Sequence, residues 1–378
     1  MVQRLSWPAT MSESNILRTV SSEWRTVKSL RTTPLQRISL LLLLLIALPS
    51  KAEVTLNGHL KALGRQSLQS SHHQLNSEQR VNLSVNKTRW SAQLQAVAQQ
   101  CNEPSQCQHW RVDRANLFWS KGNLQVTLGK HAISWGNGLV FNPVDVFNPF
   151  NPLAIDTEYK PGSNMLHLQY GLDSGNDIQA LRVEHGNDSS TAIKYHLFYN
   201  AWEWDVIAAK HLGDDMAALG FSRPLGEWLW RTELTHQKST RGIKATHIIS
   251  NLQHFFSLNG KPASVTLEWF HNGWGIDQNS TSDARLELFK RMARGEIFTP
   301  GSDYASISLG WQPHPLWQLG LTHISEAHND SHISQFFSNV NLTEALQLRI
   351  AVALPWRDSR HIDLPTERYL MAQLAWYF

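Results

Sequence analysis

This sequence has little charge, and beyond its first 50 residues it has no long apolar run. Charged residues make up 17% of the 378 residues, against about 25% in soluble domains. A membrane-spanning helix needs about 20 consecutive apolar residues, and no stretch after residue 50 provides them. Tryptophan, by contrast, is abundant at 16 residues. The composition argues against several soluble domains and favours apolar residues that recur at every second position.

The N-terminus has the pattern of a cleaved targeting segment. Two arginines precede the apolar run 38–48, and the small residues Ser50 and Ala52 stand at positions −3 and −1 of a cleavage before Glu53. Eleven apolar residues are too few to cross about 30 Å of hydrocarbon as a helix. We therefore interpret 1–52 as a signal peptide with an N-terminal extension and expect an exported mature chain.

Cysteine is nearly absent, with Cys101 and Cys107 as the only pair. An exported chain passes through an oxidising compartment, which permits a disulfide across so short a segment. Two thiols alone are too few ligands for a metal site. The sequence therefore predicts a Cys101–Cys107 disulfide in a loop.

The mature chain lacks the features of nucleic-acid or cofactor binding. Residues 1–52 carry five excess positive charges of a chain whose net charge is +3, so 53–378 has a net charge of −2. Nucleic-acid binding needs a clustered basic face. No phosphate-binding glycine loop, dinucleotide fingerprint or His-Glu-x-x-His motif is present. We expect no cofactor and no nucleic-acid partner.

Alternation is the dominant pattern of the mature chain. Between 346 and 352, for example, the large apolar side chains occupy the even positions. Period two over such lengths predicts strands with one apolar face. Eighteen segments of this kind run from 53–67 to 367–378, and sixteen strands is the alternative count.

The connections between these segments alternate in length. Those after odd-numbered segments are mostly long, and those after even-numbered ones are short, as in outer-membrane barrels with long outer loops and short periplasmic turns. A soluble β-sandwich has no reason to sort its loops in this way. The sequence predicts an all-β fold, a transmembrane antiparallel up-and-down β-barrel over 53–378 that contacts outer-membrane lipid.

One outer loop has a helical pattern. Ser282 and Asp283 are suited to cap a helix over 284–294. Leu286 and Phe289 fall on one apolar stripe of that helix. The segment is too short to span a membrane, so we expect a short helix resting on the barrel rim.

The segment 135–163 is the most distinctive loop. Three Asn-Pro pairs punctuate it, each favouring a turn, and its phenylalanines argue against disorder. A loop of this length is usually functional, and we expect it to fold inward and narrow the lumen. An outer loop packed on its neighbours is the alternative. The residues expected at the constriction are Trp135, Asn142, Pro143, Asp145, Phe147, Asn148, Asp156 and Glu158.

The alternation also identifies charged side chains that face the lumen. They have both signs, so they either form ion pairs across strands or guide a solute. The acids of the loop 135–163 would face the basic ones and set up a transverse field. The candidates are Arg114, Lys194, Glu203, Asp205, Arg231, Glu233 and Arg349, together with Arg182, Glu184 and Glu268.

A resemblance to a known family rests on the same region. The passage Gly-Lys-His-Ala-Ile-Ser-Trp-Gly at 129–136, followed by Asn-Pro-Val-Asp at 142–145, resembles a motif of porin-like outer-membrane proteins of Gram-negative bacteria. In those proteins Gly-Arg-Gln runs into Trp-Gly and then Asn-Pro-x-Asp, whereas this chain has Lys130 and His131. Some members look like partners of inner-membrane exporters of the resistance-nodulation-division (RND) type. The resemblance to outer-membrane barrels also implies that Trp376 and Phe378 form a signal for the barrel-assembly machinery.

Metal binding and catalysis receive weak support. His323, Glu326, His328, Asp330 and His332 are possible ligands, but their spacing fixes no ligand geometry, so we expect a polar loop and no metal. His-Ile-Ser occurs twice in this region without a glycine-rich elbow or an oxyanion feature, so we expect no enzyme.

Three hypotheses for function follow. The first is a porin-like channel or export conduit for a small solute or a hydrophobic cargo. The second is a structural or binding barrel whose lumen is closed by its loops. The third, which the sequence favours least, is a surface-facing enzyme that modifies lipids.

Overall fold

A computed structural model describes residues 52–102, 110–149, 151, 154, 158–172, 175–276, 280–328, 331–356 and 367–378. The predicted signal peptide, apart from Ala52, lies outside these residues, as do Cys107, Asp156 and Asp330. The cleavage site and the Cys101–Cys107 disulfide therefore stay predictions.

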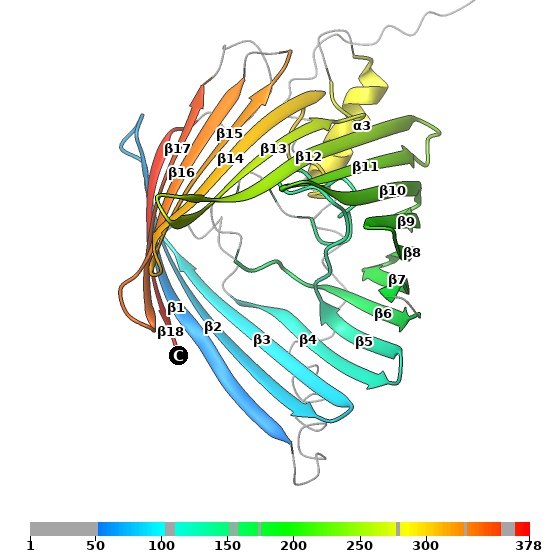
Figure 1. Ribbon diagram of the computed structural model, residues 1–378, viewed down its shortest axis with the longest axis horizontal. Coiled ribbons are helices and arrows are strands. Elements are labelled where there is room, and N and C mark those ends of the chain that lie inside the picture. Colours follow the sequence, from blue (N-terminus) through cyan, green and yellow to red (C-terminus); the bar gives the residue numbers. More distant parts are fainter. Residues whose placement is uncertain are drawn as a thin grey trace, which may run out of the picture. The chain divides into compact units, whose positions relative to one another are not determined.

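Within these residues, eighteen strands form one antiparallel sheet. Figure 1 shows how the strands follow one another around the wall. They are β1 (Glu53–Ser67), β2 (His73–Lys87), β3 (Trp90–Cys101), β4 (Trp110–Lys121), β5 (Leu124–His131), β6 (Ser163–Gly171), β7 (Asp177–His185), β8 (Asp188–Tyr199), β9 (Trp202–His211), β10 (Asp214–Leu225), β11 (Trp228–Lys238), β12 (Lys244–Leu258), β13 (Lys261–His271), β14 (Asp303–His314), β15 (Trp317–Glu326), β16 (His332–Asn341), β17 (Leu346–Trp356) and β18 (Tyr369–Tyr377). Each strand pairs with its neighbour in sequence, and β18 pairs with β1. The predicted closed barrel and its count of eighteen are confirmed, and sixteen is wrong.

The barrel closes where the last residue meets the first strand. Gly58 and Phe378 exchange two backbone hydrogen bonds, with N···O distances of 3.0 and 3.1 Å. Gly58 has no room for a side chain, because a Cβ atom there would lie 2.1 Å from the Arg80 carbonyl oxygen and 2.8 Å from the Phe378 ring. The C-terminal residue is therefore part of the seam.

The connections define two ends of the barrel. At the short-turn end, two-residue connections such as 122–123 and 259–260 place Gly122 and Asn259 at positive φ, as tight hairpins require. The other end, the long-loop end, carries the connections 132–162 and 272–302. The predicted sorting of loops by length holds, except that two connections at the long-loop end are also short hairpin turns, 186–187 and 212–213.

Side chains alternate between the two faces of the wall. On β18, Leu374 and Trp376 are 43% and 46% exposed on the outer face, while Gln373 and Ala375 are buried on the inner face. The same alternation on the other strands gives an apolar outer face, which suits a lipid environment. Among the described residues no helix is long and apolar enough to cross a membrane.

The helix α3 (Ser282–Ala293) confirms the expected outer-loop helix, with Thr281 as its cap rather than Ser282 or Asp283. Its packing differs from the expected apolar stripe: Leu286 and Phe289 are 52% and 41% exposed, whereas Glu287 and Arg291 are buried. The reason is electrostatic, since Arg291 forms ion pairs with Glu287 at 2.7 Å and with Asp214 of β10 at 2.9 Å.

The long loops divide the interior into two unlike halves. The loop 132–162 packs apolar side chains such as Val144 and Phe147 against inner-face residues of β6–β10, and Phe141 against β12–β16. The loop 272–302 covers the long-loop end of β12. The opposite wall, β1–β4, instead presents buried polar groups such as Lys61 and Arg80. The hydrophobic core therefore lies between the loops and one side of the barrel.

Candidate functional site

The loop 132–162 enters the barrel from β5 and is held by aromatic contacts. Trp135, 4% exposed, donates from Nε1 to Gln179 Oε1 of β7 at 2.9 Å. The Trp135 and Phe147 rings pack edge to face, with centroids 5.6 Å apart. Both residues were expected at a constriction, but both are buried against the wall and give the loop its attachment to it.

A wall carboxylate holds the tip of this loop. Glu268 of β13 accepts backbone N–H bonds from three consecutive residues, Leu139 at 2.7 Å, Val140 at 3.0 Å and Phe141 at 2.8 Å. Asn251 of β12 also donates to Glu268, at 3.2 Å. Hydrogen bonds to an ionised acceptor are stronger than neutral ones, so this cluster fixes the tip to the wall.

A second wall carboxylate supports the same tip. Glu233 of β11 accepts the Asn137 N–H at 3.0 Å, and Asn251 donates to the Asn137 carbonyl at 2.9 Å. Glu233 and Glu268 do lie on the inner face, as the alternation predicted, but both are buried beneath the loop. They anchor the loop and do not line an open path.

Asp145 is likewise withdrawn from the lumen. It is 3% exposed and forms an ion pair with Lys160, which also donates to the Ile133 carbonyl at 2.6 Å. Burial raises the pKa of Asp145 to about 7, and the adjacent Lys160 ammonium opposes that rise. Burial also lowers the pKa of Lys160, which Asp145 opposes. We expected Asp145 to contribute to a transverse field across the lumen. That expectation is wrong, because Lys160 balances the charge of Asp145 inside the loop.

The Asn-Pro pairs shape the loop from within. Asn142 donates to the Trp135 carbonyl at 2.8 Å, and Asn148 donates to Ser163 Oγ at 2.9 Å while accepting from the Ile133 N–H at 3.2 Å. Pro143 follows Asn142 and is buried. These residues, expected at a constriction, are structural parts of the loop.

The end of the loop reaches the polar wall. Glu158 accepts from Lys61 Nζ of β1 at 2.6 Å and from the Tyr377 hydroxyl of β18 at 3.1 Å. The neighbouring Tyr159 ring lies 4.0 Å from the Arg80 guanidinium carbon. Among the expected constriction residues that the structure describes, Glu158 therefore lies beside the polar wall of β1–β4, where it pairs with Lys61.

The wall of β1–β4 carries a charged cluster of four residues. Arg80 lies 3.0 Å from Glu78 and 2.8 Å from Asp113, and Arg111 lies 2.9 Å from Asp113. The sequence interpretation missed these residues and Lys61. Their alternation was present in the sequence, since Glu78 and Arg80 occupy the face opposite Val81.

A cavity of about 370 Å³ lies against this cluster, and it is large enough for several waters or a small organic molecule. Gln373 of β18 is 2% exposed, and its Oε1 has no hydrogen-bond partner within the part of the chain that the structure describes. The polar residues that line the cavity are Lys61, Asn76, Ser77, Glu78, Arg80, Gln99, Arg111, Tyr159 and Gln373.

The other predicted lumen residues lie apart from this cavity, paired with wall neighbours. Lys194 lies 3.0 Å from Asp205, and Glu203 accepts from Ser222 at 2.7 Å. Arg231 donates to Gln253 at 3.0 Å. Two further pairs are Arg349 with Asn339 at 2.7 Å and Arg114 with the Asp113 carbonyl at 2.9 Å.

Arg182 and Glu184 do not face the lumen. They form a 2.7 Å ion pair with side chains 58% and 49% exposed, while the alternate residues Leu181 and Val183 are buried on the inner face. The alternation of β7 had been assigned to the wrong faces, because this strand has apolar residues on both. Inner-face apolar residues are a sign of a wall covered by a loop.

The histidines near β15 and β16 make local contacts. His323 lies 2.9 Å from Ser334 Oγ, and His332 lies 2.7 Å from Ser325 Oγ. Within the described ranges no group of three or more His, Cys, Asp or Glu is arranged to hold a metal ion. Asp330, another of the expected ligands, lies outside those ranges.

Several solved structures share this fold. OccAB1 of Acinetobacter baumannii has a TM-score of 0.57 at 10% identity, covering 86% of this chain and 96% of that chain. OccK11 (OpdR) of Pseudomonas aeruginosa has a TM-score of 0.58 at 10% identity, with the same coverage. Pseudomonas aeruginosa OpdK with vanillate has a TM-score of 0.56 at 9% identity, covering 86% and 98%. These neighbours are outer-membrane porins.

The comparisons therefore show that the chain has the fold of outer-membrane porins. No protein-family model and no curated protein matches this sequence. The resemblance of the Trp-Gly and Asn-Pro-x-Asp motif, the exporter partner and the absence of enzymatic activity all stay predictions.

Proposed function

We propose that this protein is an outer-membrane channel for small solutes and that its solute path follows the wall of β1–β4. The observation that carries the proposal is the division of the interior. The loops 132–162 and 272–302 cover the inner face of β6–β16, while β1–β4 and β18 retain buried polar side chains around a cavity of about 370 Å³. A polar wall beside a cavity, inside a barrel of this strand number, suits passage of a hydrated solute.

The charges on this wall are balanced, because Lys61 pairs with Glu158 while Arg80 and Arg111 pair with Glu78 and Asp113. An acidic solute would replace one of these carboxylates as a partner of a wall guanidinium. Lys61, Arg80 and Arg111 line the cavity, and the acid lining it with them is Glu78. A guanidinium binds carboxylates through geometrically matched donors. The neighbour OpdK was solved with vanillate, an aromatic carboxylate, which supports the same class of small organic acid.

Ion selectivity in planar bilayers tests this proposal. The purified full chain should conduct. Under a KCl gradient, the reversal potential of Arg111→Gln should shift in the direction of higher cation selectivity, because Glu78 and Asp113 lose a balancing charge. Arg182→Gln is the matched control, since Arg182 lies on the outer face. Equal selectivity of the two variants would contradict a solute path along β1–β4.

A closed barrel is the second candidate, because both long loops pack inside the lumen. Phe141 stacks on Phe270 with centroids 4.8 Å apart, and six loop residues from Pro143 to Asn148 are buried. A binding or structural barrel would show no conductance in the intact chain. The same bilayer recordings therefore separate the two candidates. An export conduit for hydrophobic cargo would need an apolar path, which the polar lining of β1–β4 does not favour.

A further inference from the structure

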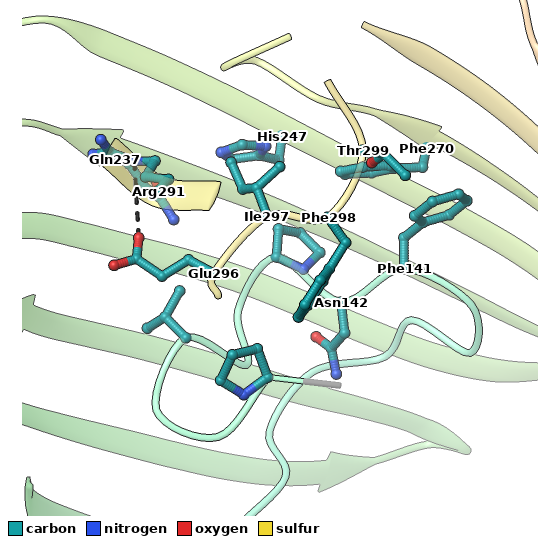
Figure 2. A pocket seen from close by; sticks show the side chains of 13 residues that line it. Phe141, Asn142, Gln237, His247, Phe270, Arg291, Glu296, Ile297, Phe298 and Thr299 are labelled. Carbon is teal, nitrogen blue, oxygen red and sulfur yellow. Dashed lines mark ion pairs between the residues drawn. The ribbon is translucent and has the colours of Figure 1, made fainter. Parts of the chain in front are cut away.

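A small cavity lies where the two inward loops meet the wall (Figure 2). Its volume is about 40 Å³. Asn142 comes from the loop 132–162, Arg291 from α3, and His247 from β12. Aromatic side chains, including Phe141 and Phe298, complete the lining. Three separate parts of the chain therefore line one small cavity.

His247 contributes a buried donor without an acceptor. The side chain is 1% exposed, and its Nδ1 accepts the Gly273 N–H at 3.3 Å. A neutral imidazole that accepts at Nδ1 carries its proton at Nε2. This Nε2 has no hydrogen-bond partner in the described ranges. A buried N–H without an acceptor costs about 1–3 kcal/mol, so such groups are normally satisfied.

Arg291 contributes a second donor to the same space. Its terminal nitrogens bind Glu287 at 2.7 Å and Asp214 at 2.9 Å, which leaves the Nε–H. The Oε2 of Glu296 lies 4.0 Å from this Nε, too far for a hydrogen bond. Asn142 adds an acceptor, because its Nδ2 donates to Trp135 while its Oδ1 has no partner among the described residues.

The charges around the cavity discriminate between possible occupants. The three basic side chains Lys290, Arg291 and Arg294 stand against the three acids Asp214, Glu287 and Glu296, so the cluster is balanced. An anion would meet the Glu296 carboxylate in the lining, and a cation would meet two N–H donors. The occupant must therefore accept from two donors and donate to an acceptor while carrying no charge.

We propose that this cavity binds ordered water that links His247 Nε2, Arg291 Nε and Asn142 Oδ1. A water needs about 10–15 Å³ of such space, so about 40 Å³ admits a few waters and no organic solute. Each water offers two donors and two acceptors, which matches the mixed set of groups. The water joins the loop 132–162, α3 and the wall into one hydrogen-bonded unit. The inference is independent of whether the barrel conducts.

Crystallography of the full chain, grown in bromide, tests the ligand directly. The expected result is a water-sized peak within hydrogen-bond distance of His247 Nε2 and Arg291 Nε, without anomalous signal. An anomalous peak would show that the cavity binds an anion. Absence of any peak would show that it binds no ligand. Either result overturns the proposal.

Hydrogen–deuterium exchange tests the linkage in solution. His247→Phe removes the Nε2 donor and should speed backbone exchange in both the loop 132–162 and α3 by about tenfold, the effect of one lost hydrogen bond. His247→Gln keeps an N–H donor and should restore slow exchange, and His236→Phe, on the outer face of β11, is the control. Unchanged exchange in His247→Phe, or faster exchange in one segment only, would contradict the shared water. If His247→Phe does not fold, two measurements still test the shared water. They are the exchange rates of His247→Gln against the unaltered chain, and the crystal structure.

Discussion

At the scale of single residues, Glu268 carries the attachment of the loop tip. Glu268→Ala leaves the N–H groups of Leu139, Val140 and Phe141 without their acceptor, and the buried Phe141 donor alone costs about 1–3 kcal/mol. The free energy of unfolding, measured in urea by tryptophan fluorescence, should fall by at least that amount. Glu268→Gln keeps a carbonyl acceptor, so its free energy of unfolding should fall by less than that of Glu268→Ala. Equal losses would mean that the carboxylate is not the anchor.

The charge of Asp145 has a structural consequence and no selectivity consequence. Asp145→Asn leaves the buried Lys160 ammonium without its counter-charge, which costs about 3–5 kcal/mol of stability. The double variant Asp145→Asn/Lys160→Met should recover part of that loss. Ion selectivity in bilayers should stay unchanged, since Asp145 is 3% exposed. A change in selectivity at unchanged stability would restore the idea of a constriction charge.

Alternation in the sequence assigns a side chain to a face but not to a partner. It placed Glu233 and Glu268 on the inner face, as the structure has them. Their partners, Asn137 and Leu139, are 96 and 129 residues away in the chain, so no local pattern could reveal the anchoring. Lys61 and Arg80 lie in the middle of β1 and β2, so the same pattern could have placed them on the inner face.

At the scale of elements, the loop 132–162 should limit the open cross-section of the barrel. Replacing 137–141 by a short glycine linker removes the tip from β11–β13 and uncovers their inner face. Single-channel conductance should then rise, because the lumen gains water-filled area. Phe141→Ala, which removes a stacked ring but keeps the backbone anchors, is the milder control and should change conductance less. A shortened loop with unchanged conductance would show that the path does not pass it.

The last strand should decide the yield of folded barrel. Deleting Phe378 removes two backbone hydrogen bonds to Gly58 and a half-exposed ring at the seam. Two such bonds are worth about 1–3 kcal/mol together, so the fraction of heat-modifiable folded protein should fall. Phe378→Tyr keeps the backbone and an aromatic ring and should fold normally. Full yield of the deletion would argue against a role in closure.

Strands were predictable from the sequence, while the packing of the helix was not. Period two identifies a strand because successive side chains point to opposite faces wherever the strand lies. The prediction that Leu286 and Phe289 form the packing face of α3 was wrong. The helix packs with Arg291 inward, because Arg291 forms an ion pair with Asp214 on a strand distant in sequence. Apolar residues on both faces, as at Ile248 and Ile249 of β12, would have indicated a wall covered from inside.

At the scale of the whole molecule, the barrel is asymmetric. One side of its wall serves as the floor for two packed loops, and the other side keeps a polar face with Lys61, Arg80 and Gln373. A path confined to one side makes the side chains of β1–β4 the ones that a solute meets. The proposed solute class depends on this asymmetry.

Single-channel conductance of a matched pair of variants on β3 tests whether the solute path follows the wall of β1–β4. Gln99 lines the polar cavity, whereas the adjacent Gln100 of the same strand is exposed and is not among the residues that line it. The account predicts that the intact chain conducts, that Gln99→Trp lowers its conductance, and that Gln100→Trp leaves it unchanged. An intact chain without conductance, or equal effects of the two substitutions, would contradict a solute path along β1–β4.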